Sequence, residues 1–151
     1  MNNPIKSIYK FNLEAGLLEQ GYSDERECAF PIEEALEDFG IKFLTDLAYR
    51  LDMTPTTSPK EISRAIIAEG PDKDLSDVDR LDKHLDTIVF AFGSIFKLGL
   101  TPQQAMNALD VVMQSNMSKL YAGQDSEGKQ LKPTSFVGPE TRLQKILEQR
   151  R

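Results

Sequence analysis

The chain has 151 residues, of which 40% are hydrophobic and 28% are charged, so its composition suits a single globular domain and excludes a disordered chain. Its formal net charge of -6 argues against nucleic acid as a main partner, because binding to a phosphate backbone needs a basic face. The single cysteine, Cys28, excludes an internal disulfide and a cysteine-rich zinc site.

Apolar residues recur at helical spacing from the first residues onward. They predict an amphipathic helix over residues 5–18, which Gly21 ends. Ser23 has the character of an N-cap for the next segment. Pro31 either starts a new helix at its first position or kinks a continuous one, and the pattern favours a strong helix over residues 32–51.

Two stretches have the residue order of a capping box with proline at the first helical position. Residues 58–61 (SPKE) predict the start of a short helix, and residues 101–104 (TPQQ) predict a helix that reaches about Leu120. Between them, Ser76 is an N-cap candidate for a long helix that Gly99 ends.

This long helix is the most apolar part of the chain. It is hydrophobic nearly all round from Leu85 to Phe96, which is typical of a helix at the centre of a bundle or at a subunit interface. A polar loop with Gly and Lys follows at about 122–138, and Pro139 precedes a short C-terminal helix. No strand pattern stands out, so the predicted class is all-α: one domain over residues 1–151, built as a bundle of about four to six helices.

No apolar run approaches the about 18 residues of a membrane span, and the N-terminus has no signal-peptide core. We therefore expect a cytoplasmic protein without a membrane partner.

Acidic residues gather on two of the predicted helices. Glu33 and Glu37 fall within about 40° of each other, and Glu34 lies about 60° further round. On the apolar helix, Asp82 and Asp86 fall within about 60° of Asp79.

Like charges that close raise each other's pKa and destabilise a fold, whereas Mg²⁺ or Mn²⁺ would turn them into hard oxygen ligands. The pattern thus predicts a divalent metal site. A plainer interpretation stays open, because Asp79 lies in a first helical turn, where acids merely cap, and Glu34 could belong to a solvated face.

Polar residues also interrupt the last apolar stripe. Asn116 either hydrogen-bonds within the bundle or points at a ligand. Lys119, one turn later, could serve a phosphate group, as could Lys129 and Lys132 from the loop, although lone lysines are usually solvated. The only histidine, His84, is interpreted as an ordinary surface or core residue.

Together these residues resemble the MazG-like all-α NTP pyrophosphohydrolases, and most closely their phosphoribosyl-ATP pyrophosphatase-like branch. The resemblance spans about Asn12 to Pro133, and SNMSK at residues 115–119 is its most specific part. The other matching pieces are EExxE at residues 33–37, Asp86 in LDTIV, and GKQLKP at residues 128–133. EExxE alone would be a weak signal, because any charged helix can show it.

One position departs from the family pattern. The family's second motif is Glu-x-x-Asp, but here Lys83 stands three residues before Asp86. Either Asp82 or Asp79 supplies the missing oxygen, or the site holds fewer metals or is degenerate.

The resemblance implies hydrolysis of the α–β phosphate bond of a nucleoside triphosphate, with a homodimer, or sometimes a tetramer, completing the helical core. It implies catalytic roles for Glu33 or Glu34 in orienting the water. The implied Mg²⁺ or Mn²⁺ ligands are Glu33, Glu34, Glu37, Asp86 and, as the substitute, Asp82. The implied substrate contacts are Asn116 and Lys119 to base or phosphate, and Lys129 and Lys132 over the triphosphate.

Two alternatives belong to other classes. The first is a catalytically degenerate helical module that binds a nucleotide or a protein partner, which Lys83 favours. The second is a purely structural helical dimer with a solvated acidic face.

Overall fold

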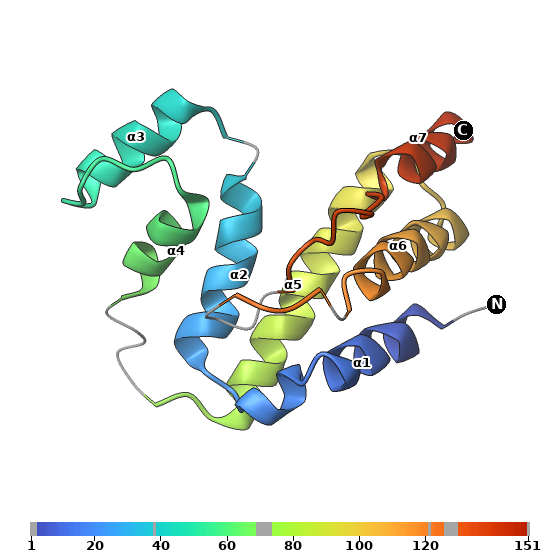
Figure 1. The fold of residues 1–151 in the computed structure, drawn as a ribbon, viewed down its shortest axis with the longest axis horizontal. Helices are drawn as coiled ribbons and strands as arrows, with labels where there is room; N and C mark the ends of the chain where they lie inside the picture. The colour runs from blue at the N-terminus through green and yellow to red at the C-terminus, as the bar shows by residue number, and fades with distance from the viewer. Residues whose placement is uncertain (1–2, 38, 69–73, 121, 126–129, 151) are drawn as a thin grey trace. The chain divides into compact units, whose positions relative to one another are not determined.

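The computed structural model describes residues 3–37, 39–68, 74–120, 122–125 and 130–150, and these residues form seven α-helices and no strand (Figure 1). The predicted all-α class is confirmed. The chain forms two compact units: unit 1 comprises Met1–Gln20 and Asp77–Arg151, and unit 2 comprises Gly21–Ser76. The expectation of one domain over residues 1–151 stays a prediction.

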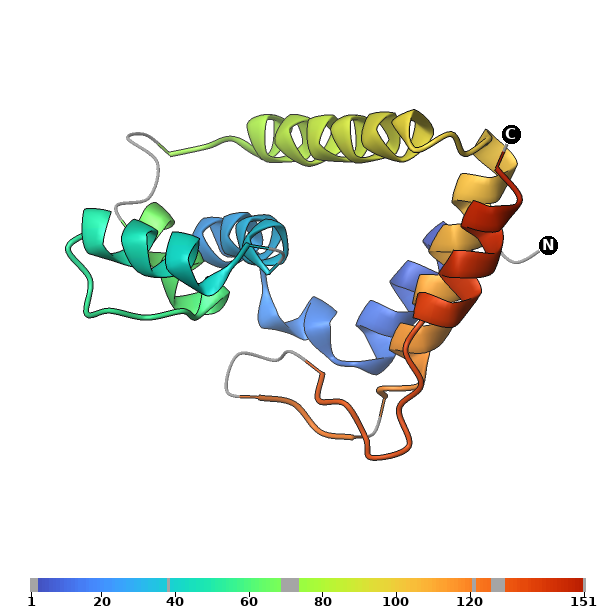
Figure 2. The ribbon, with the colours of Figure 1, turned by 90° about the horizontal axis from the view of Figure 1, so that it is seen from above.

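Unit 1 is built around α6. Its elements are α1 (Pro4–Glu14), the 3₁₀ turn η1 (Leu17–Gln20), α5 (Asp77–Lys97), α6 (Pro102–Met117) and α7 (Glu140–Glu148). Both α1 and α7 pack against α6 (Figures 1 and 2). The buried residues of this unit are Pro4, Ala15, Leu100, Ala105, Met113, Ser115 and Leu120.

The start of α6 confirms the predicted capping box at Thr101. The Thr101 Oγ1 accepts a hydrogen bond from the Gln104 amide at 3.3 Å, and the Gln104 Oε1 accepts one from the Thr101 amide at 2.9 Å. Just before it, Gly99 has a φ of 89°, a left-handed conformation that glycine adopts at little cost. Local capping therefore fixes where α6 begins after α5.

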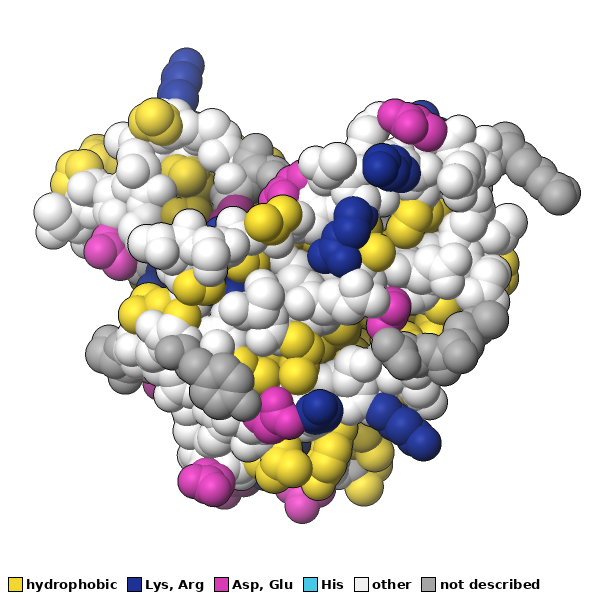
Figure 3. All heavy atoms as spheres, turned by 45° about the vertical axis from the view of Figure 1, so that its right-hand side comes forward, with side chains coloured by type: hydrophobic (Ala, Val, Ile, Leu, Met, Phe, Trp, Pro, Cys, Tyr) yellow, Lys and Arg dark blue, Asp and Glu magenta, His cyan; other side chains and the backbone are white. Residues whose placement is uncertain are grey.

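The long helix α5 is poorly covered within unit 1. Within this unit the C-terminal half of α5 packs against α6, and none of the residues of α5 is buried. Figure 3 shows hydrophobic side chains (yellow) open at the molecular surface. The large apolar side chains of α5 that are exposed are Val78, Leu81, Leu85, Ile88, Val89, Phe90 and Phe96.

Unit 2 consists of α2 (Asp24–Leu36), α3 (Ile41–Arg50) and α4 (Pro59–Ile67). Its core is a cluster to which all three helices contribute, and α2 packs closely against α4. The buried members of that cluster are Leu36, Leu44, Ala48 and Ile62.

The prediction of one helix over residues 32–51 is wrong. The helix α2 begins at Asp24 and runs through Pro31, and a separate helix, α3, follows the N-cap Gly40. Gly40 has extended backbone angles (φ −69°, ψ 156°), and glycine is a poor residue for a helix interior. The break lets Leu36 and Leu44 reach the same core from two helices.

The predicted N-caps of α2 and α4 are confirmed. The Ser23 hydroxyl accepts a hydrogen bond from the Arg26 amide, and the Ser58 hydroxyl accepts one from the Glu61 amide, both at 3.3 Å. The second half of the expected capping box at α4, a hydrogen bond from the N-cap amide to the Glu61 carboxylate, does not form as predicted. The Glu61 carboxylate instead accepts a hydrogen bond from the Thr56 hydroxyl.

Among the described helices, none is long and apolar enough to cross a membrane alone, although α5 and α6, bent by 112° at their junction, would pass as a pair by length and composition.

Replacing Ile62 by Ala should lower the free energy of unfolding by about 2–5 kcal/mol, because Ile62 has no exposed surface and its truncation leaves a cavity. Equilibrium urea unfolding followed by circular dichroism measures the loss. Ile66→Ala in the same helix is the matched control, since Ile66 is 44% exposed. Equal losses for the two variants would contradict the assignment of Ile62 to the core.

Candidate functional site

Three of the predicted acidic ligands lie at the C-terminal end of α2. Glu33 and Glu34 belong to its last turn, and Glu37 is its C-cap, with the Glu37 amide donating to the Glu33 carbonyl at 3.1 Å. Glu33 is buried, with 6% of its surface exposed, whereas Glu34 and Glu37 are exposed. The C-terminal end of a helix carries partial negative charge, so carboxylates there do not serve helix stability. The same field favours a cation.

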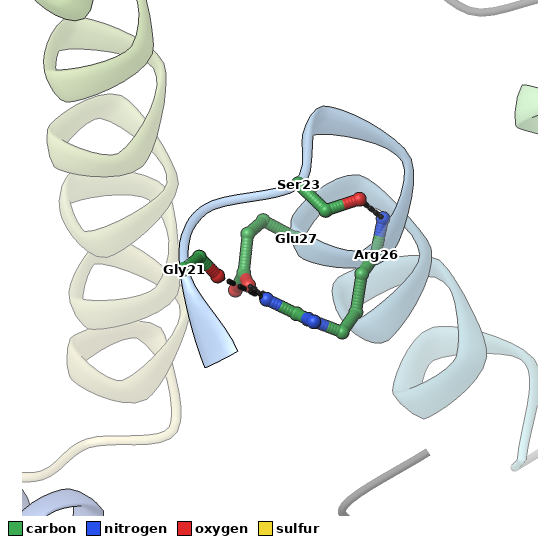
Figure 4. A network of polar contacts seen from close by, with 4 residues as sticks. All are labelled: Gly21, Ser23, Arg26 and Glu27. Atoms are coloured by element: carbon green, nitrogen blue, oxygen red, sulfur yellow. Dashed lines mark hydrogen bonds and ion pairs between the residues drawn. The ribbon is translucent and has the colours of Figure 1, made fainter. Parts of the chain in front are cut away.

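The opposite end of α2 uses its charges differently. Figure 4 shows the Arg26 guanidinium held by Glu27, with its Nε 3.1 Å from the Glu27 Oε1, and by the Gly21 carbonyl. The Ser23 cap completes this network. The first-turn acids suit the positive end of the helix dipole, and Glu27 is paired with Arg26, so we interpret this end as structural.

The acidic residues of α5 belong to unit 1. Asp82 and Asp86, the predicted ligands, and Asp79 are all exposed, while Lys83 is half-buried. Asp77 in the first turn forms an ion pair with Arg80 at 3.1 Å. The α5 carboxylates thus lie on a helix that unit 1 leaves mostly open to solvent.

Among the described residues, no three His, Cys, Asp or Glu side chains form a group that could hold a metal ion by themselves. Mg²⁺ is usually held by one or two carboxylates, with waters and substrate phosphates supplying the other ligands. Carboxylate pairs such as Glu33 and Glu37, or Asp82 and Asp86, have the hard oxygen donors that this ion requires.

The clearest polar constellation is at the C-terminal end of α6, and we name it the lysine–phenylalanine cluster: Asn116, Lys119, Lys132 and Phe136. The Lys119 Nζ donates to the Asn116 Oδ1 at 2.7 Å and lies 5.2 Å from the centroid of the Phe136 ring. The Lys132 Nζ lies 5.4 Å from the same centroid. The structure therefore brings two of the four predicted substrate contacts, Lys119 and Lys132, to one ring, and it joins a third, Asn116, to Lys119.

The fourth predicted contact, Lys129, lies outside the described residues. Phe136 is the member of the cluster that the sequence did not indicate. The available signal was a single phenylalanine in the otherwise polar segment KPTSF. The helical spacing of apolar residues, on which the prediction relied, does not extend into this loop.

The loop that carries Lys132 and Phe136 is tied back to α6. The Ser115 hydroxyl, on a residue that is 3% exposed, donates to the Val137 carbonyl at 3.2 Å. The Phe136 amide donates to the Pro133 carbonyl at 2.9 Å, which forms a turn. From the next helix, the Arg142 guanidinium donates to the Gln114 Oε1 at 2.8 Å. The first two contacts hold the backbone that carries Phe136 near the end of α6, and the third joins α7 to α6.

A cavity of about 620 Å³ in unit 1 has a different character. It is lined almost wholly by apolar side chains from α1, α5, α6 and α7, among them Ile8, Phe92, Val112 and Leu147. Nothing in this lining can bind a phosphate group or a metal ion, so the cavity is not the place for a nucleotide's charged part.

Cys28 and His84 are both half-buried. Comparison of the chain with protein-family models, with curated proteins and with solved structures found no match.

Replacing Ser115 by Ala should loosen the loop, because the Val137 carbonyl loses its buried donor, at a cost of about 1 kcal/mol. Amide hydrogen exchange should then be faster at Phe136, while the amides of α1 keep their rates. Ser118→Ala is the matched control, since the Ser118 hydroxyl bonds within its own turn, to the Ser115 carbonyl. Unchanged exchange at Phe136 in the Ser115 variant would contradict this anchoring.

Proposed function

We propose that the protein is a metal-dependent nucleoside triphosphate pyrophosphohydrolase, which converts an NTP or dNTP to the monophosphate and pyrophosphate in the cytoplasm. The observation that carries the proposal is the lysine–phenylalanine cluster. Two ammonium groups share one ring in a chain of net charge -6, and both lysines belong to the SNMSK and GKQLKP segments. A triphosphate is the kind of ligand that such a local positive site attracts.

The proposed metal ligands are the carboxylates of the two acidic sets. They suit Mg²⁺ or Mn²⁺ because their oxygens are hard donors, and because the C-terminal end of α2 favours a cation. When bound, the ion supplies neutralisation of phosphate charge and activation of a water molecule. The ligands proposed are Glu33, Glu34, Glu37 and Asp86, with Asp82 in place of the family glutamate that Lys83 replaces.

The other steps fall to the chain's own residues. Glu34 or Glu33 orients the attacking water and takes its proton as the water oxygen bonds to phosphorus and the α–β bridging bond breaks. Lys119 and Lys132 bind the phosphate oxygens and so hold the triphosphate in place. Lys129 is proposed to act with them, and Asn116 is proposed to contact the base or a phosphate.

A second candidate is a degenerate module of the same fold that binds a nucleotide or a protein without turnover. Lys83 favours it, because a half-buried lysine stands on α5 where the family has a carboxylate. A nucleotide that raises the melting temperature without release of pyrophosphate would support this alternative.

We further propose that the protein is a homodimer, or a tetramer built from such dimers. Helix α5 supports this, because it leaves seven large apolar side chains exposed along 21 residues. Soluble monomers rarely expose a continuous apolar stripe, and a second copy of the chain would remove it from water.

Replacing Glu37 by Gln should abolish turnover, because the amide keeps the shape of the side chain but loses the charge that binds the metal. The assay measures pyrophosphate released from a panel of NTPs and dNTPs with Mg²⁺ or Mn²⁺. Glu25→Gln, at an exposed position in the first turn of α2, is the matched control and should keep wild-type activity. Absence of pyrophosphate from every substrate with the wild-type chain would refute the proposed activity.

Replacing Val89 by Asp should convert the dimer to a monomer of 17.0 kDa. Val89 is 65% exposed on α5 in the single chain, and the proposed dimer would bury it. Burying a carboxylate at that interface is costly, so the variant should not associate. Light scattering coupled to gel filtration gives the mass. Tyr49→Asp, on the exposed surface of α3, is the control and should leave the mass at that of the dimer. A monomeric wild-type chain would overturn the proposed assembly.

A further inference from the structure

The Phe136 ring has two cationic neighbours, Lys119 and Lys132. The Lys119 Nζ lies 5.2 Å and the Lys132 Nζ 5.4 Å from the ring centroid, and both distances are within the about 6 Å over which a cation–π attraction acts. The two lysines come from different segments, one just after α6 and one from the following loop. The ring is therefore the element that the two ammonium groups share.

The backbone that carries the ring is held by hydrogen bonds on both sides of Phe136. The Phe136 amide donates to the Pro133 carbonyl at 2.9 Å, and the neighbouring Val137 carbonyl accepts the buried Ser115 hydroxyl at 3.2 Å. Lys119 is also tied to α6 through the Asn116 Oδ1 at 2.7 Å. The backbone at Phe136 and one ammonium group are thus both anchored to α6 or to its end.

The electron-rich face of the Phe136 ring attracts each of the two ammonium groups, so both lie about the same ring. A polyphosphate suits this arrangement better than a nucleobase does, because it carries several negative oxygens and the charges here are positive.

We propose that Phe136 is a positioning residue that holds Lys119 and Lys132 together as one cationic site, and that this site takes the polyphosphate part of the substrate and not its base. The inference rests on the proposed function for the identity of the substrate. It goes beyond the proposed function by giving the Phe136 ring a role, that of keeping the two phosphate-binding lysines together.

The test compares Phe136→Leu with Phe136→Tyr in the full-length chain. Leucine keeps the apolar bulk and removes the ring, whereas tyrosine keeps the ring. Inorganic triphosphate, which has no base, is the binding probe, and its Kd is measured by calorimetry beside the KM and kcat for the preferred NTP. Circular dichroism checks that each variant is folded.

Phe136→Leu should raise both the Kd for inorganic triphosphate and the KM by about tenfold, with little change in kcat. Phe136→Tyr, which keeps the ring, should leave both constants near their wild-type values. Phe43→Leu, a partly exposed aromatic on α3, is the matched control and should change neither constant. Lys132→Met should weaken triphosphate binding less in the Phe136→Leu variant than in the wild-type chain, because the two side chains act together.

Three outcomes would overturn the inference: an unchanged Kd in Phe136→Leu, an equal loss in Phe136→Tyr, or no binding of inorganic triphosphate by the wild-type chain. In the first of these, an accompanying rise in KM would assign the ring to the base. If the wild-type chain releases no pyrophosphate but Phe136→Leu still weakens triphosphate binding, the proposed hydrolysis fails and the anion site stands.

Discussion

Burial of apolar surface is distributed unevenly along this chain, and the two units differ accordingly. In unit 2, Leu36, Leu44 and Ile62 from three helices close a common core. In unit 1, α1 and α7 pack on α6, but α5 contributes no buried residue. Removal of apolar surface from water is worth about 25 cal/mol per Å², so covering the exposed face of α5 would stabilise the protein further. The environment of the α5 carboxylates therefore depends on what covers this helix.

Charge follows a second pattern, in which charges of one sign gather at or just beyond the ends of helices. Glu33 and Glu34 lie in the last turn of α2, where the helix dipole disfavours them. Lys119 and Lys132 share one ring, although their charges repel. A complex of a polyphosphate with a divalent cation carries both complementary charges. Its phosphate oxygens suit the lysines and its metal suits the carboxylates, so the substrate complex of the proposed hydrolysis matches the charge of each set.

The features that the sequence predicted well are those set by neighbouring residues. The N-caps at Ser23, Ser58 and Thr101 are local hydrogen bonds, so their residue order was enough to place three helix starts. The break at Gly40 was missed, because the apolar period continues across it and hides the change of direction. Phe136 was missed for another reason. Its partner Lys119 is 17 residues away, so their contact depends on the path of the loop and not on any periodicity.

Burial also separates the two glutamates that are candidates for orienting the water. Glu33 is buried in α2, and a buried carboxylate is costly unless other groups compensate its charge, so this side chain is coupled to the packing around it. Glu34, the next residue, is exposed, so a water molecule can reach its carboxylate without displacing the core. Within the proposed hydrolysis, this difference in exposure favours Glu34 as the residue that orients the water and Glu33 as a fixed ligand.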